Sequence, residues 1–171
     1  MRQSMVALWG DAVLNAALAD VSADVRSEFV ESTGLAWIRG ATIDAVVAAI
    51  GRHLGRTTDS IYDELMRHGS QRWFKTMWRV LLNLVSDDAL VSRAGIIYGR
   101  TRNIGSMTGA MAGPGRAEMI LVGWPGVPDR YARNFALGME GILLASNRAD
   151  AKVRWERTTD GAKFVATWRS K

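Results

Sequence analysis

Residues 72–85 read RWFKTMWRVLLNLV, and this stretch decides the fold that we predict for the chain. Its polar residues recur at steps of three and four, so on a helix they form one narrow stripe. The apolar residues cover the other faces, which predicts a helix that is buried on several sides. At about 1.5 Å per residue this helix spans about 20 Å, the thickness of a small domain. We therefore predict that residues 72–85 form the central helix of a single hydrophobic core.

Further helices are predicted on both sides of this central helix. Helical spacing of apolar residues predicts them over residues 10–20, 22–31, 42–55, 58–69 and 87–98. Ser22 and Thr42 are the predicted N-caps of two of these helices, because a hydroxyl there can accept a hydrogen bond from a free first-turn amide. His68 and Gly69 have the composition of a helix end. The first half of the chain is therefore predicted to be all-helical.

Beyond Gly105 the hydrophobic period changes from helical to two, the period of a strand. Strands are predicted over residues 106–112, 116–124, 152–158 and 162–169. Gly113-Pro114-Gly115 joins the first two as a hairpin turn, and Thr159-Asp160-Gly161 joins the last two. Pro125 and Pro128 precede a helix between the hairpins. The chain is thus predicted to be an α+β protein in which helices are followed by the order β-β-α-β-β.

The composition is that of an ordinary globular protein. With 171 residues the chain fits one domain over residues 1–171. It contains no cysteine, which excludes disulfides and thiolate metal sites and suits a reducing cytoplasm. No stretch approaches the ~20 apolar residues that span a bilayer. We therefore expect a cytoplasmic protein without a membrane span.

Residues 89–116 contain four arginines and no acidic residue, in a chain of net charge +5. This segment forms either an anion-binding or nucleic-acid surface or a solvated, mildly basic face. Within it, Arg100 and Arg102 are the candidate anion-binding residues. We do not expect nucleic acid as a partner, because the chain has no zinc-finger motif and no RNA-binding sheet motif.

The second half of the sequence carries the features of a known group of domains. The first predicted hairpin is followed by a helix that begins Pro128-Asp129-Arg130-Tyr131 and carries Gly138-Met139-Glu140-Gly141-Ile142, and the last hairpin ends in Trp168. Together with the helical first half, this pattern resembles an uncharacterised bacterial family placed near haem-nitric-oxide-binding domains, vinyl-4-reductase-type domains and the small subunits of the TRAPP tethering complex. The resemblance covers roughly residues 40–170.

This resemblance implies an N-terminal helical layer packed on a C-terminal four-stranded antiparallel sheet, with an apolar cavity between them. Members of the group use the cavity for haem, small hydrophobic molecules or acyl chains, and several pair into dimers. The haem-binding members need a proximal histidine and a Tyr-x-Ser-x-Arg clamp for the propionates. The segment from Tyr98 to Arg102 matches that motif loosely, with His68 upstream of it. A histidine in a last helical turn is more often a partner of the helix dipole, so we expect no haem, no metal and no other cofactor.

The apolar residues of the central helix and the sheet are better candidates for a binding site. Methionine and tryptophan form adaptable, flat-walled cavities that suit an apolar ligand. The predicted pocket residues are Trp73, Met77, Trp78, Leu81, Met119, Leu121, Phe135, Met139, Trp155, Phe164 and Trp168. The alternative is that these side chains fill the core and leave no cavity.

The sequence offers little support for catalysis. It has no serine in a nucleophile elbow, no His-Glu-x-x-His motif and no Walker lysine. We therefore predict a non-enzymatic ligand-binding or regulatory domain that takes an apolar small molecule. A scaffold with a filled core, whose function is protein contact alone, is the second alternative, and a haem-based gas sensor is the third. Trp9, Trp37 and Trp124 lie outside the clearest periodic segments and suggest a partner surface, so we also predict a homodimer.

Overall fold

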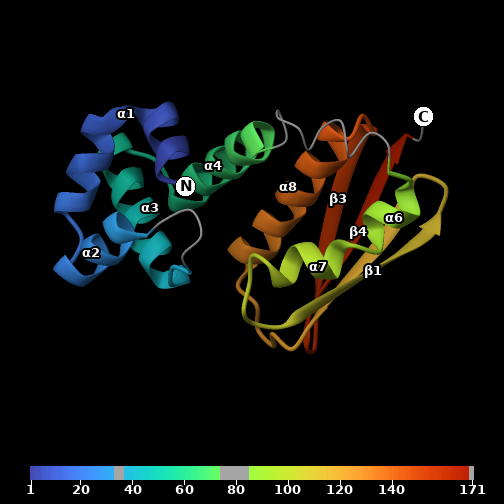
Figure 1. Ribbon diagram of the computed structural model, residues 1–171. Coiled ribbons are helices and arrows are strands. Elements are labelled where there is room, and N and C mark those ends of the chain that lie inside the picture. The colour runs from blue at the N-terminus through green and yellow to red at the C-terminus, as the bar shows by residue number, and fades with distance from the viewer. Residues whose placement is uncertain (33–36, 74–84, 170–171) are drawn as a thin grey trace. The chain divides into compact units, whose positions relative to one another are not determined.

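The chain divides into two compact units, Met1–Gly69 and Ser70–Lys171 (Figure 1). Each unit has its own hydrophobic core. The computed structural model describes residues 1–32, 37–73 and 85–169. Residues 74–84 of the predicted central helix, and with them its predicted burial, lie outside the described residues. The single domain over residues 1–171 stays a prediction.

The first unit is all-helical, as predicted. Its helices are α1 (Arg2–Ala19), α2 (Ala23–Glu31), α3 (Gly40–Leu54) and α4 (Thr58–Trp73), and α4 continues past the boundary between the units. Gly10 interrupts α1 with a φ of 81°, a left-handed conformation that glycine adopts without steric cost. The buried apolar residues of this unit are Met5, Leu14, Ala17, Leu18, Phe29, Val46, Val47, Ala49, Ile50, Ile61, Tyr62 and Leu65.

The predicted helix ends in this unit are partly confirmed. Ser22 is the N-cap of α2, and its hydroxyl accepts a hydrogen bond from the amide of Val25. The prediction for Thr42 is wrong: α3 begins at Gly40, and the Thr42 hydroxyl donates to the carboxylate of Glu28 on α2. The predicted end at His68 and Gly69 is also wrong, because Gly69 keeps a negative φ and α4 continues to Trp73. A glycine ends a helix only when it leaves the helical conformation.

The second unit contains the four-stranded antiparallel sheet that the sequence predicts. Its strands are β1 (Ser106–Gly113), β2 (Arg116–Val122), β3 (Ala149–Thr158) and β4 (Gly161–Arg169), in the spatial order β1-β2-β4-β3. Each hairpin joins two neighbouring strands, and the pairing of β2 with β4 joins the two hairpins. The order β-β-α-β-β and the α+β class are thereby confirmed.

Helices α6 (Asp87–Val91), α7 (Ala94–Gly99) and α8 (Asp129–Ala145) cover one face of this sheet (Figure 1). The stretch predicted as one helix over residues 87–98 is therefore two short helices. Helices α6 and α7 pack on β1, and α8 packs on β3 and β4. Side chains alternate along the strands, so that the face under the helices is apolar and buried while the other face is charged and exposed. We call these the inner and outer faces of the sheet.

The helices that the structure describes lack the combination of length and hydropathy that a bilayer crossing requires.

Candidate functional site

The predicted pocket residues whose side chains the structure describes all belong to the hydrophobic cluster of the second unit. Those buried on the inner face of the sheet are Met119, Leu121, Phe164 and Trp168. Those half-buried at the margin of the cluster are Phe135 and Met139 on α8 and Trp155 on β3. The remaining predicted residues, whose side chains lie outside the description, are Trp73, Met77, Trp78 and Leu81. The sheet and α8 thus bring one part of the predicted site together.

Three of these residues form a row across the sheet. Met119 on β2 is the direct partner of Phe164 on β4, which is in turn the partner of Trp155 on β3. Directly opposite side chains on one face of antiparallel strands pack together. At the β1 end of this row stands Gly109, where an added Cβ would lie 2.6 Å from the carbonyl oxygen of Val91. The end of α6 therefore lies directly on β1, and glycine is the residue that allows this approach.

An aromatic cluster lies beside the row, with Phe135 of α8 at its centre. The Phe135 ring makes edge contacts with Tyr98 of α7 at 5.5 Å and with Phe164 at 6.3 Å between ring centroids. Trp124 contacts the same ring at 6.3 Å and Tyr131 at 5.4 Å. Aromatic pairs favour such tilted and edge-to-face geometries. Through Phe135 the cluster connects α7, α8 and the sheet.

The segment that resembles a propionate clamp does not adopt a clamp geometry. Tyr98 lies in α7 instead of a strand, and its hydroxyl donates to the carbonyl oxygen of Ile104 at 2.6 Å. Burial raises the pKa of the Tyr98 phenol above its ordinary value. Arg100 is exposed, whereas the Arg102 guanidinium lies 5.3 Å from the centre of the Phe135 ring. Tyr98 and Arg102 both lie against Phe135 while Arg100 points to solvent, so the three side chains do not form a clamp.

The two histidines have different environments. Nε2 of His53 lies 2.9 Å from a carboxylate oxygen of Asp20, so His53 has a structural partner. Nε2 of His68 on α4 is buried and has no hydrogen-bond partner among the described residues. A buried imidazole nitrogen without a partner carries a desolvation cost.

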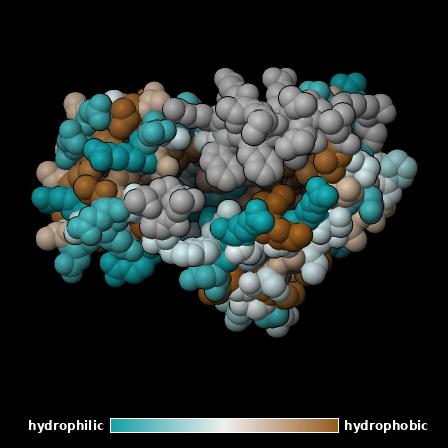
Figure 2. Space-filling model, viewed as in Figure 1, coloured by the Kyte–Doolittle hydropathy of each residue, from teal (hydrophilic) through white to brown (hydrophobic). Residues whose placement is uncertain are grey.

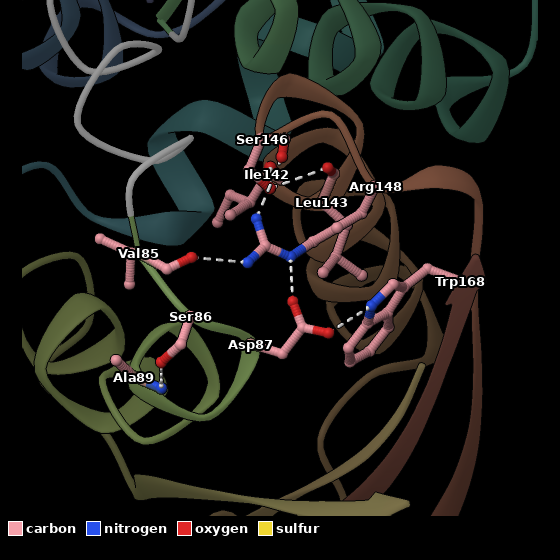
Figure 3. A network of polar contacts seen from close by, with 9 residues as sticks. All are labelled: Val85, Ser86, Asp87, Ala89, Ile142, Leu143, Ser146, Arg148 and Trp168. Carbon is pink, nitrogen blue, oxygen red and sulfur yellow. Dashed lines mark hydrogen bonds and ion pairs between the residues drawn. The ribbon is translucent and has the colours of Figure 1, made fainter. Parts of the chain in front are cut away.

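A polar network, which the sequence analysis missed, crosses the second unit (Figure 3). Arg148 lies just before β3 with its side chain only 6% exposed, and it donates from three nitrogens. Its Nε donates to Oδ1 of Asp87 at 2.7 Å, Nη1 to the carbonyl oxygen of Ser146 at 3.0 Å and Nη2 to that of Val85 at 2.9 Å. The second carboxylate oxygen of Asp87 accepts from Nε1 of Trp168 at 3.0 Å. We call this the Arg148 network.

The Arg148 network joins chain segments that are distant in sequence. Asp87 opens α6, with Ser86 as its N-cap; Ser146 ends α8; and Trp168 lies near the end of β4. Asp87 is an acid of the first turn of α6, and no local signal in the sequence shows that its partners lie 61 and 81 residues away. A buried arginine needs most of its donors satisfied, and here both ends of the guanidinium are bonded.

Comparison with known proteins finds solved structures of similar fold but no related sequence. The sequence matches no protein-family model, and it matches no curated protein. An oxygen-binding H-NOX domain related to soluble guanylate cyclases aligns with a TM-score of 0.68 at 14% identity, over 98% of this chain and 90% of that chain. The Fe(II) unliganded H-NOX protein of K. algicida aligns with a TM-score of 0.69 at 13% identity, over 99% of this chain and 92% of that chain. A structure concerned with H-NOX activation aligns with a TM-score of 0.70 at 14% identity, over 98% of this chain and 92% of that chain. The chain thus resembles haem-nitric-oxide-binding domains in fold, as its sequence pattern predicts.

Proposed function

We propose that the chain is a non-enzymatic ligand-binding or regulatory domain, whose second unit holds an apolar small molecule between its helices and the inner face of the sheet. The observation that carries this proposal is the set of half-buried apolar side chains at the margin of the core, Phe135, Met139 and Trp155. They pack against fully buried neighbours and still keep exposed surface. Flat aromatic rings and a flexible methionine form the kind of wall that an apolar ligand covers.

The fold adds support of a weaker kind. One structure that shares it is an H-NOX domain described as oxygen-binding, in its oxygen complex. A shared fold does not fix a function, so the proposal rests on the residues of this chain. Among the described polar residues of the second unit, Ser86 caps a helix, Asp87 pairs with Arg148 and the Ser146 hydroxyl donates to a backbone carbonyl, so these groups have structural roles. A cytoplasmic location stays a prediction that rests on the lack of cysteine.

Native mass spectrometry of the purified chain tests the proposal. We expect an added mass that is released when the protein is denatured by organic solvent. The variant Met139→Trp fills space beside the core and should lower the fraction of protein that carries the mass. Leu144→Trp is its matched control, because Leu144 lies on the same helix and is 53% exposed. If the wild type carries no added mass, the core is filled, and a scaffold that acts through protein contact alone replaces the proposal.

A haem-based gas sensor is the second candidate, and it is favoured by the fold and by the buried Nε2 of His68. Neutral imidazole is a common metal ligand. The segment from Tyr98 to Arg102 nevertheless lacks the clamp geometry, so the described residues do not fit haem, and we derive no haem-dependent step. Absorbance of the purified protein near the Soret band tests this candidate. We expect no such band, and we expect His68→Ala to leave fold and spectra unchanged. A Soret band that disappears in His68→Ala would put the sensor first.

We further propose that the chain forms a homodimer. Of the three tryptophans that suggested a partner surface, Trp37 is 59% exposed. Trp9 is half-buried and donates to Glu64, and Trp124 packs on Tyr131. In the second unit, hydrophobic surface lies over α7 (Figure 2), where Ile96 is 61% exposed. Exposed apolar groups of this kind favour association. Sedimentation analysis should show a dimer, and a monomer at tens of micromolar would contradict it.

A further inference from the structure

The outer face of the sheet carries a groove of about 630 Å³ that runs along β4. Its floor includes Val165 and Thr167, which have short side chains. Its sides come from the longer side chains of the neighbouring strands, and the charged residues that line it are Arg116, Lys152, Arg154, Glu156 and Lys163. The two-residue period of the strands places these charged residues on the outer face of the sheet, opposite the buried core.

The register of the sheet sets the width of the groove. Thr167 of β4 is the direct partner of Arg116 on β2 and of Lys152 on β3, so it has a cation on each side. Adjacent strands lie about 4.8 Å apart, and the backbones that carry these two cations are therefore about 10 Å apart. Val165 lies in the next row, with Glu118 on one side and Arg154 on the other. This spacing suits one extended chain lying between β2 and β3.

The charges of the groove are not balanced within the protein. Glu118 is engaged by Lys163 at 2.8 Å and by Arg116 at 3.5 Å, and the hydrogen bond from Lys163 lowers the pKa of the Glu118 carboxyl. Lys152 and Arg154 are both exposed and have no ion-pair partner among the residues that the structure describes. An anionic group placed over β4 would therefore meet two cations that no internal carboxylate occupies.

We propose that this groove is a docking site for an extended, acidic peptide segment of a partner protein. Charge complementarity selects the occupant, because cations outnumber acids around the floor. The narrow width and the uncharged floor match a single chain whose side chains alternate between the floor and the solvent. A nucleic-acid duplex or a lipid surface would need cations spread over a wider area without acids among them, whereas Glu118 and Glu156 lie within or beside the groove. Trp155, a margin residue of the proposed ligand pocket, also lines the groove, but the docking proposal rests on the charged residues of the outer face and does not depend on that pocket.

Fluorescence anisotropy with a fluorescein-labelled oligoglutamate peptide tests the proposal on the full chain. We expect saturable binding at low salt that weakens as salt is added. The double variant Lys152→Glu/Arg154→Glu should weaken it at least about tenfold, since two attractive charges become repulsive. The control is Arg2→Glu/Arg52→Glu, which makes the same change in net charge on exposed residues of the first unit. Thermal unfolding of both variants confirms that they are folded.

The alternatives give different results in the same assay. An equal loss in both double variants would mean that the peptide responds only to net charge, and it would overturn the proposal. Tighter binding of single-stranded oligothymidylate than of the peptide would assign the groove to nucleic acid. Binding to phosphatidylcholine–phosphatidylserine vesicles without binding to the peptide would assign it to a membrane surface. A wild type that binds none of these probes would show that the face is merely solvated.

Discussion

In each unit of this protein an arginine–carboxylate network joins separate elements, and the two networks, centred on Glu28 and on Arg148, differ in burial. In the first unit Glu28 of α2 accepts from the backbone amide of Arg39 at 2.9 Å and from its Nε at 2.8 Å, and it also accepts from Thr42. The Arg39 side chain is 68% exposed. In the second unit the Arg148 side chain, bonded to Asp87, is 6% exposed.

Burial changes what such a network contributes. Solvent screens an exposed ion pair, so that its contribution to stability is small. A buried pair is not screened, and removing one partner leaves the other without its compensating charge. The two networks also differ in reach, since Glu28 and Arg39 are 11 residues apart while Arg148 and Asp87 are 61 apart. From this comparison we expect that breaking the buried network of the second unit costs more stability than breaking the exposed network of the first.

The largest effect is expected for Arg148→Met. The change keeps an apolar stem but removes the donors to Asp87, Val85 and Ser146, and breaking a buried pair from one side costs about 3–5 kcal/mol. The measurement is the free energy of unfolding from urea denaturation followed by circular dichroism. The matched control is Arg169→Met, because Arg169 pairs with Asp150 with both side chains exposed; its cost should stay below about 1 kcal/mol. Equal losses of unfolding free energy in the two variants would show that burial does not determine how much an arginine–carboxylate pair contributes to stability.

A smaller effect is expected for Trp168→Phe, which removes the Nε1 donor to Asp87 and keeps an aromatic ring. A hydrogen bond to a charged group contributes about 1.5–3 kcal/mol. Trp155→Phe makes the same change on the neighbouring strand, where the structure shows no hydrogen bond from the indole nitrogen within the described residues. The difference between the two free energies of unfolding reports the hydrogen bond together with the deeper burial of Trp168. If Trp155→Phe is the more destabilised variant, Trp168 acts through packing alone.

The smallest effect is expected for Glu28→Gln at neutral pH, because its network is exposed. Lowering the pH should nevertheless reveal the contribution of Glu28 to stability. The guanidinium of Arg39, followed by the Thr42 hydroxyl, lowers the pKa of Glu28 from 4.5 to about 2. Because the folded pKa is lowered, the carboxylate stabilises the fold above pH 4.5, and this contribution is lost as the pH falls toward 2.

The difference in urea midpoint between wild type and Glu28→Gln reports this contribution. It should be constant above about pH 5 and should shrink as the pH is lowered toward 2. Asp24→Asn, on the same helix, controls for the general effect of removing an acid. A difference that grows on acidification would contradict the assigned direction of the pKa shift.

Much of the fold could be predicted from local patterns. Both hairpins follow from a two-residue period on each side of a glycine-containing turn, and α8 follows from helical spacing after Pro128. Local signals failed where a tertiary contact competed with them. Thr42 has a good capping side chain, but Glu28 takes its hydroxyl from another helix.

The candidate site divides in the same way. The inner-face residues, such as Phe164 and Trp168, were identified because alternation along a strand separates a buried face from an exposed one. The segment from Tyr98 to Arg102 was matched by residue type alone, and its backbone is a helix end followed by a turn. A motif needs both its residues and its backbone geometry, and the sequence showed only the residues.

The sequence by itself determined the order of the elements, the faces of the strands and the α+β class, because each depends on the spacing of neighbouring residues. Only the tertiary structure decided that β2 pairs with β4, that Arg148 meets Asp87, and that the cations of β2, β3 and β4 share one groove. These features join residues that are tens of positions apart. Hydrophobic periodicity specifies which side of an element is buried, and it does not specify the partner that buries it. The partner is chosen by the packing of the whole chain.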